Sequence, residues 1–148
     1  MKTGVLTVSL DFELYWGVRD KRSIVGYREN LEGVRLAIPA ILDLFERYGV
    51  HATWATVGFL FCDDLAALRE ARPDVLPLYR NEQHSPYRYI DGLRSDGALD
   101  RYLFAGDLLD QIQSTPHQEI GTHTLSHLYC LEEGVTAEAL KSDLTMAR

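Results

Sequence analysis

The sequence predicts a parallel α/β fold, because short strand-like segments alternate with amphipathic helical segments along the chain. Runs that are rich in β-branched, aromatic and other apolar residues occupy positions 4–10 and 51–58, and a further short strand is expected at 118–121. Segments with the apolar periodicity of helices lie between them. Strands of a parallel sheet are buried on both faces and read as nearly continuous apolar runs, as the first of these segments does.

The longest predicted helix covers residues 30–48. Apolar residues recur there at intervals of three and four, and Gly49 follows as a C-terminal stop. Pro39 lies inside the pattern and is expected to kink or divide the helix. Thr136 is the predicted N-cap of the last of three further helices, which cover residues 63–72, 105–113 and 136–147.

The signals for regular structure weaken between residues 73 and 103. Proline, glycine and polar residues are frequent there, which predicts a long loop, and such loops in compact domains are usually functional or mobile. Four tyrosines of this segment are candidates for lining a substrate groove, with core packing as the alternative for each: Tyr79, Tyr87, Tyr89 and Tyr102.

A single domain over residues 1–148 is expected, since the length is close to that of an average domain and no repeat or linker interrupts the chain. Hydrophobic residues make up 46% of the sequence and charged residues 25%, which is the balance of a globular protein rather than a disordered one. The net charge of −7 and the scattered basic residues argue against a nucleic-acid partner.

The sequence contains no apolar stretch near the ~20 residues that a membrane-spanning helix needs. Asp11 interrupts the apolar N-terminal run, so this run does not read as a secretory signal, and a cytoplasmic protein is expected. Cys62 and Cys130 are too few and too widely separated for a disulfide framework or a cysteine-based zinc site. Both are expected to be buried free thiols.

Two histidines stand four residues apart in the run Gly121-Thr-His-Thr-Leu-Ser-His127. On a helical turn, four steps of ~100° bring His123 and His127 to the same side, where both imidazoles can reach one metal ion. Two incidental histidines are the alternative reading. The pattern differs from that of the zinc proteases, because Thr124 stands where their motif has its glutamate.

Asp11 and Glu13 end the first predicted strand. In an extended segment, residues two apart face the same way, so both carboxylates would point into one site. Functional groups of parallel α/β folds gather where strands end, and the histidine pair also follows a predicted strand. Two histidines and one carboxylate leave an open position for water, as in catalytic zinc sites, and the other carboxylate could act as a base. The alternative is that Asp11 and Glu13 are only capping or turn residues at the end of the strand.

Three segments of the chain, LTVSLDFELYWG, HATWATVGFLF and QEIGTHTLSHLYC, together resemble the polysaccharide deacetylases, the NodB-homology domain of carbohydrate esterase family four. In that family an acidic motif ends the first strand and H-[S/T]-x-x-H supplies two metal ligands. The acidic motif here is a D-x-E variant of the more common adjacent aspartates. The resemblance implies that Asp11 is the general base and that Glu13, His123 and His127 are the metal ligands.

The resemblance also implies an overall fold and an activity. The fold is a distorted (β/α) barrel, of which this chain would form the N-terminal portion, because the later motifs of the family have no counterpart before Arg148. The activity is zinc-dependent hydrolysis of N-acetyl or O-acetyl groups on a polysaccharide or its precursor. A fragment of this kind is expected to be inactive and to self-associate. A cyclic-amide hydrolase of the same fold, or a non-catalytic metal- or carbohydrate-binding remnant, are the alternatives.

Further residues near the predicted ligands are candidates for supporting roles. Thr124 is expected to orient His127, with a plain local hydrogen bond as the alternative. Tyr15 and Trp16 follow the acidic motif and are candidates for stacking on a sugar, with packing as the alternative. The other histidines have no carboxylate or histidine at ligand spacing and are predicted not to bind metal: His51, His84 and His117.

Overall fold

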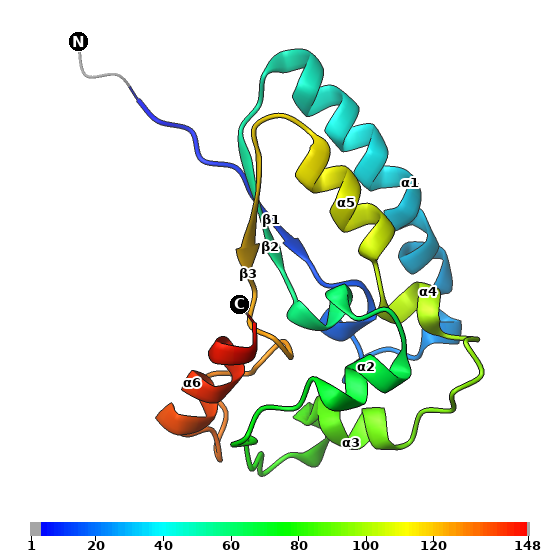
Figure 1. The fold of residues 1–148 in the computed structure, drawn as a ribbon, viewed down its shortest axis with the longest axis vertical. Helices are drawn as coiled ribbons and strands as arrows, with labels where there is room; N and C mark the ends of the chain where they lie inside the picture. Colours follow the sequence, from blue (N-terminus) through cyan, green and yellow to red (C-terminus); the bar gives the residue numbers. More distant parts are fainter. Residues whose placement is uncertain (1–3, 148) are drawn as a thin grey trace.

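The computed structural model describes residues 4–147, and its centre is a three-stranded parallel sheet (Figure 1). The strands are β1 (Ser9–Phe12), β2 (Ala52–Thr56) and β3 (Gln118–Thr122), in the order β1-β2-β3. The register pairs Leu10 with Trp54 and Trp54 with Ile120. The predicted parallel α/β fold is therefore confirmed. The described residues form an open sheet and show no closed barrel.

Helices α1 (Ile24–Tyr48) and α5 (Gly106–Ser114) lie together on one side of the sheet (Figure 1). Alternate strand residues point toward them, and Trp54 of β2 is the centre of this contact. Its ring lies 6.5 Å from the ring of Phe12 on β1 and 6.5 Å from the ring of Phe45 on α1. Burial of these large apolar side chains holds the sheet against the helices.

Helix α1 begins six residues earlier than predicted, at Ile24. Ser23 is its N-cap, and the hydroxyl of Ser23 accepts a hydrogen bond from Gly26 N at 3.1 Å. Pro39 does not divide the helix, which continues to Tyr48. The predicted stop is confirmed, since Gly49 adopts a left-handed conformation with φ of 61°.

Strand β1 is shorter and starts later than predicted, because pairing with β2 begins only at Ser9. Val8 O still accepts a hydrogen bond from Thr53 N at 3.1 Å, but residues 4–7 run away from the sheet (Figure 1), and the side chains of Val5 and Leu6 are exposed. The strand ends at Phe12, inside the acidic motif that was predicted to end it, and Asp11 pairs with Ala55. The apolar composition predicted a strand over residues 4–7, which pair with no strand among the described residues.

The segment from residue 73 to 103 contains short helices instead of one long loop, which corrects the prediction. Tyr79, Tyr87 and Tyr102 are buried, so packing and not a groove accounts for them, whereas Tyr89 is half-buried. The remaining elements of the chain are the helices α2 (Leu65–Glu70), α3 (Pro86–Asp91), α4 (Asp100–Leu103) and α6 (Ala137–Met146), and the 3₁₀ turns η1 (Leu14–Gly17), η2 (Gly58–Phe61) and η3 (Glu82–His84).

Helix α6 begins as predicted, with the Thr136 hydroxyl accepting a hydrogen bond from Ala139 N at 3.1 Å. Cys62 is half-buried and Cys130 is exposed, so the prediction of two buried thiols is wrong for Cys130. Between residues 4 and 147, the helices are all too short or too polar to cross a membrane.

Candidate metal centre

The predicted ligands meet at the carboxyl ends of the strands. Glu13 follows β1 directly and His123 follows β3 directly. Glu13 Oε1 lies 3.0 Å from His123 Nε2 and 3.1 Å from His127 Nε2. The ligand atoms of these three residues all lie within 4.8 Å of one another. Asp11 is adjacent, with its Oδ1 3.9 Å from His123 Nδ1. The structure therefore brings together all four residues that the sequence singled out.

A change of backbone direction aims Glu13 at the histidines. Glu13 leaves the extended conformation (φ −129°, ψ −25°), and its carbonyl accepts a hydrogen bond from Trp16 N at 3.1 Å, which opens η1. Gly17 is the last residue of this turn and lies against the Glu13 carboxylate. A Cβ atom on Gly17 would lie 1.6 Å from Glu13 Oε2, so only glycine leaves room for the carboxylate in this position. The sequence analysis did not identify Gly17, because nothing local marks its contact with Glu13.

The two histidines do not lie on a helical turn, so this part of the prediction is wrong. The segment from His123 to His127 is an irregular loop, in which Thr124 has φ of 65° and His127 has φ of 55°. Left-handed conformations of non-glycine residues cost of order 1–3 kcal/mol each and persist only where the surroundings hold them. The loop brings the two Nε2 atoms to Glu13 by a route that helical spacing does not describe.

The start of η2 holds one side of this loop. Gly58 N donates to Thr124 O at 2.9 Å, and Phe59 N donates to Leu125 O at 3.0 Å. Gly58 approaches the loop closely, since a Cβ atom there would lie 3.0 Å from Leu125 Cα. Because Gly58 and Phe59 follow β2, the central strand fixes the position of the histidine loop.

Thr124 acts on the backbone of the loop. Its hydroxyl accepts a hydrogen bond from Leu128 N at 2.8 Å, and Thr124 N donates to Thr122 Oγ1 at 3.1 Å. Among residues 4–147, its hydroxyl makes no hydrogen bond to the His127 ring. Thr124 therefore does not orient the His127 ring by direct contact. The structure contains the local hydrogen bond that was the alternative.

Tyr15 and Trp16 are core residues, which corrects their assignment as sugar-stacking candidates. Tyr15 is 5% exposed and donates its hydroxyl proton to Arg22 O at 2.8 Å. Trp16 is fully buried, and its Nε1 donates to Leu103 O at 2.8 Å. Neither ring has a free face that a sugar could cover.

The acidic residues differ in their surroundings. The Glu13 side chain is 24% exposed and the Asp11 side chain 62% exposed. The hydrogen bond from His127 lowers the pKa of Glu13 below its usual value, and the nearby charge of both histidines acts in the same direction, although burial opposes them. The folded chain therefore favours the charged form of Glu13, which is the form that binds a cation, while Asp11 stays accessible to water.

These residues fit a zinc ion. A tetrahedral ion with ligand distances of about 2.0–2.1 Å holds two ligand atoms about 3.4 Å apart, close to the observed contacts of Glu13 with His123 and His127. Without metal, the same distances correspond to N–H···O hydrogen bonds, so metal binding would release the shared protons. Two histidines and a carboxylate leave one position open for water, as in catalytic zinc sites.

The other histidines lie apart from this group. His51 and His117 stack on each other, with ring centroids 4.2 Å apart, where β2 and β3 begin. His84 Nδ1 lies 3.6 Å from a carboxylate oxygen of Glu132. In the part of the chain that the structure describes, Glu13, His123 and His127 are the only three acidic, histidine or cysteine side chains that are close enough together to share a metal ion.

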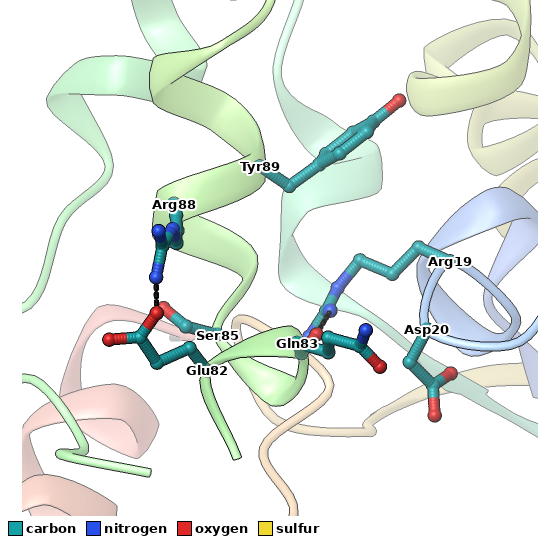
Figure 2. Close-up of a pocket in the computed structure, with 7 residues that line it drawn as sticks. All are labelled: Arg19, Asp20, Glu82, Gln83, Ser85, Arg88 and Tyr89. Carbon is teal, nitrogen blue, oxygen red and sulfur yellow. Dashed lines mark hydrogen bonds and ion pairs between the residues drawn. The ribbon is translucent and has the colours of Figure 1, made fainter. Parts of the chain in front are cut away.

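A separate pocket of about 310 Å³ lies beside η3 (Figure 2). Its cations already have partners. The guanidinium of Arg19 donates to the backbone carbonyls of Gln83 and His84, and Arg88 pairs with Glu82. The pocket offers no group of metal ligands, so the centre at Glu13 is the better candidate for chemistry. The side chains that line the pocket belong to Arg19, Asp20, Glu82, Gln83, Ser85, Arg88 and Tyr89.

No protein-family model matches the chain, and no curated protein or solved structure matches it either. The case for the site therefore depends on its own geometry.

Proposed function

We propose that this chain provides the metal centre of a zinc-dependent hydrolase that removes N-acetyl or O-acetyl groups from a polysaccharide or its precursor. The observation that carries the proposal is the position of the Glu13 carboxylate between the Nε2 atoms of His123 and His127, with the exposed carboxylate of Asp11 beside them. Two histidines and a carboxylate are a ligand set of catalytic zinc.

The proposed chemistry assigns a different task to each acid. Zinc at this site would polarise the acetyl carbonyl and lower the pKa of water toward ~7. Glu13 and the histidines would hold the ion. Asp11 would accept the proton of the attacking water, since its carboxylate is exposed and close to the ligands. The oxygen of water would bond to the acetyl carbon, and the bond to the sugar nitrogen or oxygen would break. Acetate would leave, and an acid other than these four residues would give a proton to the sugar nitrogen or oxygen.

The acetylated polysaccharide as substrate is inferred from the resemblance of three sequence segments to the polysaccharide deacetylases. The exposure of Asp11 is compatible with it, because a large substrate can reach this carboxylate from solvent. The same resemblance leads us to propose that the parallel sheet is the first part of a distorted (β/α) barrel. Three parallel strands with helices on one side are compatible with this arrangement.

The test combines metal analysis with an assay of acetate release from an acetylated chito-oligosaccharide, with zinc or cobalt supplied. The protein should hold about one zinc ion, and His123→Ala and Glu13→Ala should both lose it. Measured in a longer chain that carries the later motifs of the family, Asp11→Asn should keep the ion but lose about 10²- to 10⁴-fold in turnover, because general base catalysis contributes that much.

Two outcomes would contradict parts of the proposal. Equal zinc content of the wild type and His123→Ala would exclude the metal site. Loss of zinc in Asp11→Asn, with retention in Glu13→Ala, would mean that base and ligand are exchanged. A cyclic amide offered in parallel separates the remaining alternative, since turnover of that compound without acetate release would assign the site to cyclic-amide hydrolysis.

A further inference from the structure

A buried carboxylate from α6 holds the histidine loop on the side opposite η2. Asp143 is 1% exposed. Its Oδ1 accepts a hydrogen bond from Leu125 N at 2.7 Å, and its Oδ2 accepts one from Ser126 Oγ at 2.5 Å. Leu125 and Ser126 are themselves buried, and they stand between His123 and His127. Both carboxylate oxygens are therefore used to bind the loop that carries two of the three proposed ligands.

The loop needs this support because its conformation is unfavourable by itself. Thr124 and His127, on either side of the two residues that Asp143 binds, both have left-handed φ angles. The hydrogen bonds from Gly58 N and Phe59 N reach the loop carbonyls from one side only. Asp143 accepts hydrogen bonds from the other groups of the loop, which are Leu125 N and the Ser126 hydroxyl. The loop is thus held between η2 and α6.

An ionised carboxylate in this place is not a favourable choice for stability alone. Burial raises the pKa of Asp143, and the hydrogen bonds from Ser126 and Leu125 only partly oppose this effect. An apolar residue at this position of α6 could pack against the loop, but it could not accept two hydrogen bonds in fixed directions. The carboxylate therefore fixes the orientation of the loop through two directed hydrogen bonds.

We propose that Asp143 is a positioning residue of the metal centre, which keeps the loop from Thr124 to His127 in the conformation that aims both imidazoles at Glu13. This inference depends on the proposed metal site, since positioning has a purpose only if the two Nε2 atoms share a ligand. Asp143 does not touch the metal or the substrate in this scheme, and it acts through Leu125 and Ser126.

The test compares four variants. Asp143→Ala removes both acceptors and should weaken zinc binding about 10- to 100-fold, as loss of groups that orient ligands typically does. Asp143→Asn keeps a planar group of the same shape, whose oxygen can accept from Leu125 N, and should stay within about threefold of the wild type. Ser126→Ala removes one hydrogen bond and should weaken binding about 3- to 10-fold.

Thr136→Ala is the matched control, because it removes the N-cap of the same helix without touching the loop. It should lower the melting temperature and leave zinc affinity unchanged. Zinc affinity is measured by chelator competition, and the cobalt absorption spectrum reports the ligand geometry. A disturbed spectrum in Asp143→Ala, restored in Asp143→Asn, is the signature that a purely structural role would not produce.

The outcomes separate this inference from the proposed function. If Asp143→Ala binds zinc as tightly as Thr136→Ala, the positioning role is wrong while the metal site stands. If Asp143→Ala does not fold, unchanged affinity in Ser126→Ala overturns the role instead. If the wild type binds no zinc, the proposed function fails. The positioning role then fails with it, because it depends on the metal site.

Discussion

Alanine at position 17 is expected to remove metal binding and leave the fold intact. The added Cβ would lie 1.6 Å from Glu13 Oε2 and 2.6 Å from Glu13 Cδ, whereas ordinary contacts begin at 3.4 Å. The carboxylate must therefore withdraw by almost 2 Å from Gly17. Gly17 itself does not have a left-handed φ, so alanine adds no backbone strain, and the conflict falls entirely on the Glu13 side chain.

The size of the effect follows from the ligand distances. Oε1 and Oε2 belong to one rigid group, so the withdrawal breaks the contacts of 3.0 and 3.1 Å with His123 and His127. Structural zinc sites gain about 10–16 kcal/mol from four ligands, so one ligand is worth about 2.5–4 kcal/mol, or roughly 10²- to 10³-fold in affinity. The fold should lose less than about 1 kcal/mol, a shift of at most about 4 °C in Tm, because a partly exposed side chain can turn outward.

Chelator competition measures the affinity, and thermal unfolding of metal-free protein measures the fold. Gly33→Ala is the control, because Gly33 lies inside α1 with nothing within 4 Å of an added Cβ. It should keep zinc affinity and gain about 0.5–1 kcal/mol of stability, as glycine to alanine changes in helices do. Zinc affinity of Gly17→Ala within threefold of the wild type would refute the argument, since Glu13 would then not need its observed position to bind.

Two further predictions concern ionisation and thiol reactivity. Because the folded protein lowers the pKa of Glu13 below 4.5, the stabilisation from its charge is complete above about pH 4.5 and is lost as the pH falls further. With a chelator present to keep the protein free of metal, the difference in unfolding free energy between wild type and Glu13→Gln should therefore shrink from pH 6 to pH 3. A constant difference would contradict this prediction. Burial, with Asp63 and Asp64, raises the pKa of Cys62 to about 11, so its thiolate fraction at pH 8 is only about 10⁻³. Exposed Cys130 should be alkylated first in mass spectrometry, and equal rates would be the opposing result.

Local signals in the sequence were sufficient for the order of the three strands and for the four residues, Asp11, Glu13, His123 and His127, that meet where strands end. The left-handed glycine after α1 and the Thr136 cap of α6 depend on neighbours within a few residues. The meeting of Glu13 with the histidines follows from parallel strands, whose carboxyl ends share one edge of the sheet. These features need no knowledge of distant contacts.

Only the tertiary structure decided the conformation of the site. Helical spacing predicted a turn for His123 to His127, but hydrogen bonds from the residues after β2 and from α6 hold a left-handed loop there. Burial of Trp16 depends on Leu103, which lies 87 residues away. Gly17 and Asp143 likewise act through space, one against the Glu13 carboxylate and the other on the loop. Periodicity and spacing report only local geometry, and so the contacts that position the proposed metal ligands are visible only in the folded chain.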